Sequence, residues 1–229
     1  VILGYAQLLQ EDVPPGGQMQ ADLRTIEKQT KVCKKIVADL LGFSRRGAGV
    51  RVDLCANNTV LECISLVRHT FELDRVRILT DLDERMPIIH GDPERLKQVW
   101  INLLANAHDA MPEGGAIKVR TRLDPQAQRL RLWVADTGSG IGTEDLPRIF
   151  DPFYTTKPVG QGTGLGLAVS FGIIKDHGGS IKAERPSIGW FSPDDPPPGV
   201  AAGRGTVFLV ELPVDNAPEN SQYPPSKED

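Results

Sequence analysis

The sequence lacks the features that mark several common classes of protein. Its three cysteines, Cys33, Cys55 and Cys63, show no C-x-x-C spacing and no pairing with histidine, so they do not predict a metal site or a disulfide framework. We expect all three to be small buried residues in a reducing compartment. No apolar run has the length of a membrane span, and the first residues do not read as a signal peptide. With 26 Lys and Arg against 30 Asp and Glu, the net charge of −4 argues against a general nucleic-acid partner.

Two familiar phosphate-binding motifs are also absent. There is no G-x-x-x-x-G-K-[ST], which excludes a P-loop. The glycines alternate from Gly160 to Gly166, so G-x-G-x-x-G fails at its last position, and Pro152 and Pro158 argue against the strand that a Rossmann fingerprint requires. A glycine-rich loop that opens into an apolar helix nevertheless suits a phosphate group. The sequence therefore predicts a different phosphate-binding design.

Residues 1–44 predict a helical hairpin. Residues 1–12 carry an apolar stripe at helical spacing, and the V-P-P-G-G run at 13–17 breaks it. The second helix, from about Gln18 to Ser44, has core positions that alternate by four and three, typical of a coiled coil or four-helix bundle: Met19, Leu23, Ile26, Thr30, Cys33, Val37 and Leu40. Two helices cannot close such a core, so we expect the hairpin to form a homodimer. Packing against the following domain is the alternative.

A mixed α and β pattern follows a predicted linker at residues 45–49 and extends over residues 50–213. The pattern predicts strands at 50–54, 76–82, 117–123, 130–136, 180–184 and 205–213, with another starting at Ile88. Helices are expected at 57–71, 92–111, 143–146 and from the glycine cluster to about His177. Residues 186–204 form a Pro- and Gly-rich insertion whose Trp190 and Phe191 are expected to hold it to its own domain. Residues 214–229 predict a disordered tail.

Two places in this domain bring polar residues together. Asp92-Pro93-Glu94 starts a helix with an acid cap and proline at the first helical position. Asn102, Asn106 and Asp109 then share one face beside the core stripe, which favours a site over a solvated surface, although the latter stays open. The predicted strand 130–136 ends in Asp136, with Gly138 and Gly140 directly after it. Polar residues at strand ends are favoured functional positions.

Four motifs occur in order: N-L-L-A-N-A at 102–107, D-T-G-S-G at 136–140, F-D-P-F-Y-T-T-K followed by G-Q-G-T-G-L-G-L at 150–167, and G-R-G-T at 203–206. Together they resemble the catalytic ATP-binding domain of sensor histidine kinases, in the wider family of gyrase, Hsp90 and MutL. Residues 1–44 resemble the dimerisation hairpin of those kinases. The resemblance implies an α+β fold, in which a two-layer Bergerat-type sandwich follows a hairpin that forms a dimeric four-helix bundle.

The resemblance also implies a role for each motif residue. Asp136 would accept a hydrogen bond from the adenine amino group, Gly138 and Gly140 would let the backbone approach the base, and Thr206 would support it. Ile141 would be a further nucleotide contact. Asn106, with Asn102 beside it, would bind Mg²⁺ through its amide oxygen. Asp109 would contact the ion indirectly, through a ligand of the ion or through water. Phe150 to Gly164 would form a mobile lid, with the phosphates held by Lys157 and the residues around the helix start: Gly162, Thr163, Gly164, Leu165, Gly166 and Leu167.

One position separates the kinases from their hydrolysing relatives. The relatives carry a Glu four residues before the magnesium-binding Asn, where it activates water, whereas this chain has Asn102 there. An amide cannot act as a base, so the site is expected to hold ATP for transfer, with Asn102, Asn106 and Lys157 contributing by position and charge. An ATPase of the gyrase, Hsp90 or MutL type is the alternative. A degenerate nucleotide-sensing module is a weaker one, since all four motifs are present.

The phosphoacceptor is not expected among these residues. His69, His90, His108 and His177 are the only histidines, and all lie outside the hairpin, so we expect them to be structural or surface residues. Because Val1 falls inside an apolar helical pattern, we expect a fragment whose acceptor histidine lies upstream. A response-regulator receiver domain is the expected partner and the cytoplasm the expected compartment, with no nucleic acid and no membrane contact within these residues.

Overall fold

The computed structural model describes residues 1–14, 16–44, 50–84, 88–158, 162–186, 190–191 and 205–214, and within 31–44 only the side chain of Cys33. The predicted linker, most of the insertion and the tail beyond Val214 lie outside the described residues. The chain forms two compact units, residues 1–48 with 142–172 and residues 49–141 with 173–229.

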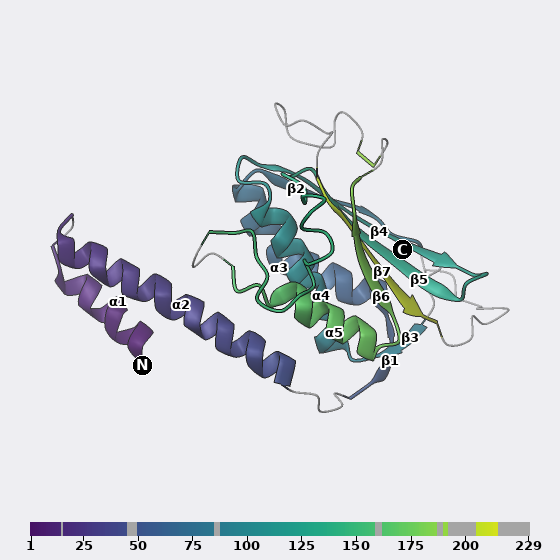
Figure 1. Cartoon of the computed structure of the whole chain (residues 1–229), viewed down its shortest axis with the longest axis horizontal. Coiled ribbons are helices and arrows are strands. Elements are labelled where there is room, and N and C mark those ends of the chain that lie inside the picture. The colour runs from purple at the N-terminus through teal and green to yellow at the C-terminus, as the bar shows by residue number, and fades with distance from the viewer. Residues whose placement is uncertain are drawn as a thin grey trace, which may run out of the picture. The chain divides into compact units, whose positions relative to one another are not determined.

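The helical hairpin forms as predicted, with α1 at Ile2–Asp12 and α2 at Gln18–Ser44 lying side by side (Figure 1). Ala6 and Leu23 are buried between the helices, and Glu27 accepts hydrogen bonds from two glutamines of α1. Two helices cover only part of the apolar surface. Side chains at predicted core positions and along α1 therefore stay exposed within one chain: Ile2, Tyr5, Leu8, Leu9, Met19 and Ile26.

The cysteine prediction is partly wrong. Cys63 is buried, as expected, and burial raises the pKa of its thiol to about 11. Cys55 is half-buried, and Cys33 is exposed on α2. The expectation for Cys33 assumed that its helical face was covered, and a single hairpin does not cover it.

The second unit contains two sheets. β1 (Val52–Cys55) pairs with β3 (Ile88–Gly91) as an antiparallel ribbon. The main sheet has the order β2-β4-β5-β7-β6 and is mixed, because β2 (Val76–Asp81) runs parallel to β4 (Gly115–Asp124) while the other pairs are antiparallel. The remaining strands are β5 (Arg129–Asp136), β6 (Ser180–Glu184) and β7 (Val207–Pro213). This mixed sheet confirms the predicted α+β class.

Helices α3 (Ala56–Leu73) and α4 (Pro93–Asp109) cover one face of the main sheet (Figure 1). The stripe predicted for α4 is its buried face: Leu96, Val99, Trp100, Leu103, Leu104 and Ala107. Trp100 donates from Nε1 to Thr59 Oγ1 of α3 over 2.9 Å, which satisfies its polar edge inside the core. Alternate residues of the central strands point into this same core, as the two-residue period of a strand requires.

The start of α4 is fixed by local chemistry, as the sequence predicts. The Asp92 carboxylate accepts hydrogen bonds from the backbone N–H groups of Glu94 and Arg95, at 3.1 and 3.2 Å. Pro93 occupies the first turn, where a missing N–H costs nothing. This cap fixes where α4 begins, and the buried stripe fixes the side on which its polar residues lie.

One predicted helix does not form. Residues 143–150 make a series of tight turns, with Asp145 N bonded to Gly142 O at 3.1 Å and Arg148 N bonded to Asp145 O at 2.8 Å. The prediction of a short helix at 143–146 is therefore wrong. One helical bond forms, from Leu146 N to Gly142 O at 3.2 Å, but three-residue turn bonds follow it, because the segment is too short to propagate a helical ladder.

The fifth helix, α5 (Gly166–Asp176), stops at Gly178 with φ +70, as predicted for the Gly178-Gly179 pair. Ile173 and Ile174 of its last turn are buried in the second unit. Among the described residues, no helix is both long and apolar enough to cross a membrane.

His177, just after α5, is a buried structural histidine. Its Nε2 accepts the N–H of Asp92 over 3.0 Å, and its Nδ1 lies 2.7 Å from the carbonyl oxygen of Ile173. Burial lowers the pKa of His177, so the neutral ring is the folded form. A protonated ring could no longer accept the Asp92 N–H. The other histidines are also structural or exposed: His90 bonds to Asp53, His108 bonds to Asp74 and stacks on Phe71, and His69 is exposed.

We expect His177→Leu to lower the free energy of unfolding by about 1–3 kcal/mol at pH 8, because Asp92 N–H loses its acceptor. The loss should shrink at pH 5.5. A depressed pKa gives stability above the unfolded value of 6.5, and the wild type loses that stability as the pH falls. Urea titrations at the two pH values measure the effect, with the exposed His69→Leu as control. An equal loss at both pH values would contradict a neutral His177.

Candidate nucleotide-binding site

Asp136, the last residue of β5, is the buried acid at the centre of the candidate site, with only 2 % of its surface exposed. Its Oδ1 accepts the N–H of Gly138 at 2.8 Å and the N–H of Thr206 at 3.2 Å. Both hydrogen bonds that this carboxylate accepts within the described part of the chain go to Oδ1. Oδ2 therefore remains available to accept a hydrogen bond from a ligand.

Burial raises the pKa of Asp136 to about 6, although the two backbone N–H groups work in the opposite direction. The folded protein thus carries a carboxylate in a setting that disfavours its charge. At neutral pH the group is still mostly ionised and is an acceptor only. Such an acceptor selects for a ligand that brings an N–H donor.

Thr206 lies beside Asp136 in the neighbouring segment that leads into β7. The two backbones are joined by the bond from Asp136 N to Thr206 O at 2.9 Å. Gly205, with φ +143, packs so closely that a Cβ there would overlap the carbonyl oxygen of Asp136. Glycine at 205 is therefore required for this pairing.

The glycine loop after Asp136 is packed against the end of α4. A Cβ at Gly138 would lie 2.6 Å from the carbonyl oxygen of Ala110, and Ser139 N donates to the same oxygen over 3.1 Å. Gly140 has φ +76, and a Cβ there would lie 3.0 Å from Gly205 O. These contacts join the strand end that carries Asp136 to the helix that carries the two asparagines.

The structure places Asn102 and Asn106 one turn apart on α4, and both side chains are half-buried. Asp109, at the end of the helix, is exposed, and its carboxylate lies 3.8 Å from His108 Nδ1. Within the described ranges, no group of three or more His, Cys, Asp or Glu could hold a metal ion. Two amides one turn apart are compatible with Mg²⁺, since this ion binds through few protein groups and completes its shell with phosphates and water.

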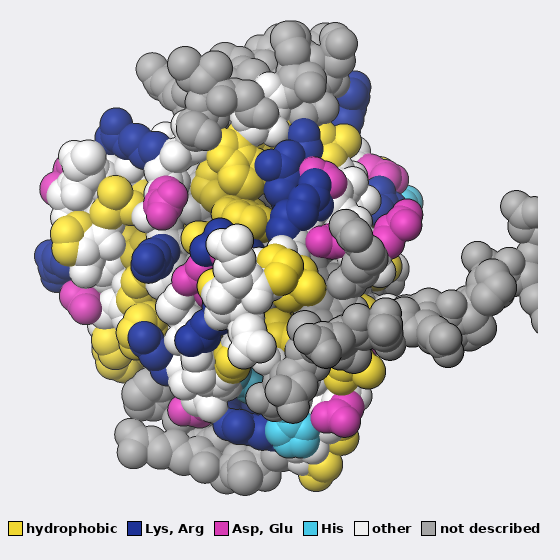
Figure 2. All heavy atoms as spheres, turned by 90° about the vertical axis from the view of Figure 1, so that its right-hand side faces the viewer, with side chains coloured by type: hydrophobic (Ala, Val, Ile, Leu, Met, Phe, Trp, Pro, Cys, Tyr) yellow, Lys and Arg dark blue, Asp and Glu magenta, His cyan; other side chains and the backbone are white. Residues whose placement is uncertain are grey.

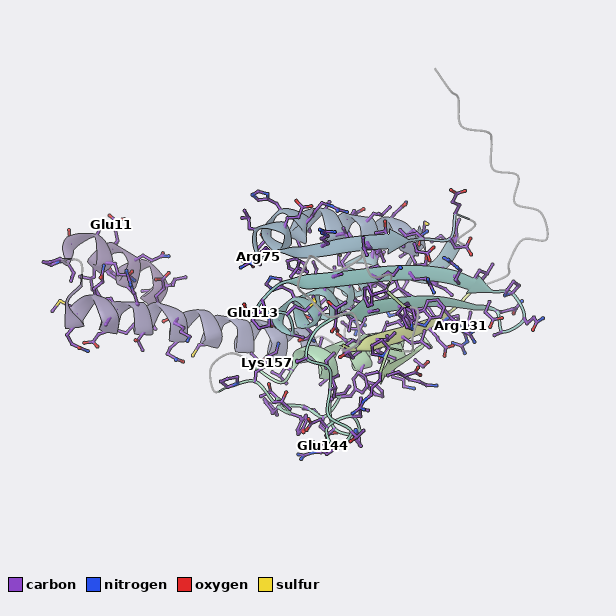
Figure 3. The ribbon with its side chains drawn as sticks, turned by 90° about the horizontal axis from the view of Figure 1, so that it is seen from above. Glu11, Arg75, Glu113, Arg131, Glu144 and Lys157 are labelled. Carbon is purple, nitrogen blue, oxygen red and sulfur yellow. The ribbon has the colours of Figure 1, made fainter. Side chains whose placement is uncertain are left out.

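The predicted lid residues belong to the other compact unit. Lys157, labelled in Figure 3, is half-buried, and a Cβ at Gly162 would lie 3.3 Å from its Cβ. Gly164 has φ +65 and accepts the N–H of Phe153 over 3.0 Å. Gly166 begins α5, so the glycine cluster does enter a helix start as predicted.

The other lid residues have local supporting contacts. Phe150 packs against Phe171 with ring centroids 5.5 Å apart. Thr163 Oγ1 accepts the N–H of Leu165 over 3.3 Å, which supports the turn before the helix. Leu165 is buried and Leu167 is half-buried, as is Ile141 in the second unit. Residues 159–161 lie outside the described residues.

Two residues of the site were not predicted. Thr137 accepts the N–H of Ala116 at Oγ1 over 3.0 Å and so joins the site loop to β4. Gly205 shapes the Asp136–Thr206 pairing. The motif G-R-G-T contains Gly205, but the sequence gives no sign that its second glycine packs against a strand end far away in the chain.

Two family models match the chain. The model described as histidine kinase-, DNA gyrase B- and HSP90-like ATPase matches residues 91–216, and the His Kinase A phospho-acceptor domain matches residues 1–49. The first covers Asn102, Asn106, Asp136, the glycine segment and Thr206. The second covers the hairpin.

Three curated proteins illustrate the similarity. The sensor histidine kinase ZraS of Salmonella typhimurium (strain LT2) is 32 % identical over 213 residues, which span 93 % of this chain and 42 % of that protein. AtoS of Escherichia coli (strain K12), a signal transduction histidine-protein kinase, is 35 % identical, over 96 % of this chain and 33 % of its own length. For the sensor kinase CckA of Brucella abortus the identity is 34 %, over 84 % of this chain and 20 % of that protein. The chain thus spans less than half the length of these relatives.

Solved structures of histidine kinases also resemble this chain. The nucleotide-free catalytic domain of histidine kinase ThkA has a TM-score of 0.60 and 31 % identity, covering 72 % of this chain and 95 % of that domain. A structure of ThkA in complex with the response regulator TrrA has a TM-score of 0.68 and 25 % identity, covering 93 % of this chain and 57 % of that one. The likeness therefore extends over both the hairpin and the sheet domain.

Proposed function

The chain belongs to the sensor histidine kinase family, and from this we propose that it is the ATP-binding catalytic core of such a kinase. It would transfer the γ-phosphoryl group of Mg-ATP to a histidine, from which the group passes to an aspartate of a response regulator. The observation that carries the proposal is the buried Asp136 carboxylate, whose Oδ1 is occupied by backbone donors while Oδ2 is left for a ligand.

Asp136 would recognise adenine through its amino group. The ionised carboxylate offers only acceptors, and a base with a carbonyl oxygen at the equivalent position would leave two acceptors facing each other. Gly138 and Gly140 would let the base approach the backbone, and Thr206 would complete the contact. Ile141 would be a further apolar neighbour. The close packing of Gly138 on Ala110 supports this role, because it fixes the backbone that follows Asp136.

Asn106 would bind Mg²⁺ through its amide oxygen, with Asn102 one turn away. The bound ion would neutralise charge on the phosphate oxygens during transfer. Asp109 would act at a greater distance, through water. The half-buried position of both asparagines, on a helix whose start the Asp92 cap fixes, supports this role.

Lys157 and the residues at the start of α5 would hold the phosphates of ATP. Backbone N–H groups at a helix start favour anions, and Lys157 adds a positive charge. The contributing residues are Gly162, Thr163, Gly164, Leu165, Gly166 and Leu167, with Phe150 as part of the same lid.

Asn102 favours transfer over hydrolysis, because its amide cannot take a proton from water. Catalysis would therefore rest on positioning by Asn102 and Asn106 and on the charge of Lys157. The alternative is an ATPase of the gyrase, Hsp90 or MutL type. A steady-state ATPase assay separates the two: turnover that is well above background, lost in Asn106→Ala and independent of any other chain would favour the ATPase.

The phosphoryl acceptor would be a histidine outside these 229 residues. His90, His108 and His177 are held by Asp53, Asp74 and Asp92, and none of the four histidines lies on the hairpin. The exposed apolar side chains of α1 and α2 support a homodimer through residues 1–44. A receiver domain would be the second partner, as in the ThkA–TrrA structure, and the cytoplasm, where ATP is available, the compartment.

We expect no stable phosphoryl label on this chain after incubation with Mg²⁺ and ATP labelled in the γ position. A form extended at Val1 by a helical segment that carries a histidine should instead acquire an acid-labile, alkali-stable label. The same extended form with Asn106→Ala is the control and should stay unlabelled. Acid-labile label on the 229-residue chain itself would contradict the assignment of its histidines.

A further inference from the structure

The far face of the main sheet, away from α3 and α4, carries a small apolar cluster directly behind the site. Phe191, only 9 % exposed, packs in this cluster with Ala116, Ala135 and Val207. Leu79, Trp133 and Trp190 pack against its rim. Figure 2 views the molecule from the right of Figure 1, the side of this face, where hydrophobic side chains border Lys and Arg.

Each strand residue under Phe191 has a site residue as its neighbour. Ala135 precedes Asp136, and Val207 follows Thr206. Ala116 exchanges two hydrogen bonds with Thr137, from its N to Thr137 Oγ1 at 3.0 Å and from Thr137 N to its O at 3.1 Å. Successive strand residues point to opposite faces of the sheet. Phe191 therefore packs against the backbone of β5 on the face opposite to the Asp136 carboxylate.

Trp190 is held in place by three contacts. Its carbonyl oxygen accepts a hydrogen bond from Lys118 Nζ over 3.1 Å. The guanidinium of Arg120 lies 4.9 Å from its ring centroid, a cation–π distance, and the Trp133 ring lies 6.2 Å away. Trp190 and Phe191, called the anchor below, are therefore packed on the main sheet. This confirms the expectation that these aromatic residues pack on their own domain.

The anchor and part of the site belong to the same segment of the chain, which connects β6 to β7. Residues 190–191 and residues 205–206 both lie between β6 and β7. Thr206 supplies one of the two N–H groups to Asp136 Oδ1, and Gly205 packs against the Asp136 backbone. A shift of Phe191 would act on Asp136 through Ala135 and on Thr206 through Val207, the residues that Phe191 contacts.

We propose that Trp190 and Phe191 are positioning residues of the nucleotide site, so that the packing of these two residues on the far face sets the affinity for adenine nucleotide. The proposal rests on adenine recognition by Asp136. Phe191 keeps Ala135 and Val207, which pair across the β5–β7 ladder, free of water at the point where the ladder ends. Without it, the ladder end loosens and the 2.8 and 3.2 Å bonds to Oδ1 lengthen.

The test compares three variants by calorimetry with Mg-ADP. Phe191→Ala should weaken binding about 10-fold, and Phe191→Leu, which keeps most of the apolar volume, should stay within about 3-fold of wild type. Leu209→Ala is the matched control: Leu209 pairs with Trp133 on the same face but is flanked by core residues. It should change affinity less than 2-fold. Trp190→Ala replaces Phe191→Ala if the latter does not fold, with a weakening of at least 3-fold expected.

A second readout does not depend on nucleotide. Carboxyl carbon NMR of Asp136 follows its titration. Longer hydrogen bonds to Oδ1 alone would raise the pKa, but burial is the larger cause of its shift, so the entry of water in Phe191→Ala should make the pKa fall toward the ordinary Asp value. Leu209→Ala should leave it unchanged. Wild-type affinity together with an unchanged Asp136 titration in a folded Phe191→Ala would overturn the positioning role. A wild-type protein that binds no adenine nucleotide would instead overturn the proposed function, and the NMR comparison would still decide the positioning role.

Discussion

Asp136→Asn is expected to weaken ATP binding about 10- to 100-fold and to stabilise the nucleotide-free protein. Asn can still accept the N–H groups of Gly138 and Thr206 at its oxygen. Its NH₂ group then takes the place of Oδ2 and faces the adenine amino group, donor against donor. The loss corresponds to about 1–3 kcal/mol, the usual cost of an unsatisfied buried polar contact.

The gain in stability follows from the sign of the pKa shift. The pKa of Asp136 is raised from 3.8 to about 6, so the folded state binds a proton more tightly than the unfolded state. Ionisation at neutral pH therefore costs the fold at most about 3 kcal/mol, and an uncharged Asn avoids that cost. The advantage of Asn should be largest above pH 7 and shrink as the pH falls toward 4, because the wild type then becomes protonated.

Asp81→Asn is the matched control. The Asp81 carboxylate is bonded to Arg122 at 2.7 Å and Arg120 at 2.8 Å, and these bonds lower its pKa. Replacement of the Asp81 carboxylate by an amide should slightly destabilise the protein, because solvent screens the lost ion pairs. It should leave nucleotide affinity unchanged. Calorimetry and urea titration measure both quantities. Equal affinity for ATP in Asp136→Asn would remove this residue from adenine recognition, and lower stability would mean that its ionised form is well solvated.

The opposite signs at Asp136 and Asp81 distinguish a carboxylate kept for a ligand from one that supports the fold. The structure holds Asp81 between two arginines, which favours its charge. Within the described residues the carboxylate of Asp136 accepts hydrogen bonds from backbone N–H groups, and burial outweighs them. A buried acid that opposes folding is a candidate functional residue on physical grounds alone.

Local signals predicted the parts of the site that depend on local chemistry. The Asp92-Pro93-Glu94 cap and the apolar stripe were sufficient to orient α4, and the alternation of residues 130–136 was sufficient to bring Asp136 to a strand end. Both patterns are contained in fewer than two dozen consecutive residues. The roles of the motif residues came from the resemblance to a family, since spacing alone does not name a ligand.

Contacts between distant segments were beyond the reach of local patterns. Gly205 matters because it touches Asp136, and the packing of Phe191 behind Ala135 depends on which strands are neighbours. The short helix expected at 143–146 failed although Leu146, Ile149 and Phe150 have helical spacing, because Pro147 follows the acidic start at once and the turns do not propagate. Helix starts and strand alternation are short-range properties, whereas sheet order is not.

Among the described glycines of the second unit, Gly205 is the one at which a substitution by Ala is expected to have the largest effect. Its φ of +143 is a conformation that L residues rarely adopt, and the added Cβ would overlap the Asp136 carbonyl oxygen. Backbone atoms cannot rotate away as side chains do, so the segment before β7 must shift. We expect a loss of about 3 kcal/mol or more in the free energy of unfolding, combining backbone strain with overpacking.

The loss of nucleotide affinity in Gly205→Ala should exceed the loss that partial unfolding of the variant would cause. The shift moves Thr206, whose N–H bonds to Asp136 Oδ1 and whose carbonyl accepts Asp136 N–H, so two bonds of the site are disturbed together. Affinity measured at a temperature where the variant is folded should drop at least 100-fold, or about 3 kcal/mol. Gly172→Ala is the control, because a Cβ at this helical position meets nothing within 4 Å. It should leave affinity unchanged and stabilise α5 by about 0.5–1 kcal/mol. A folded Gly205→Ala with wild-type affinity would mean that the Asp136–Thr206 pairing is not needed to hold the nucleotide.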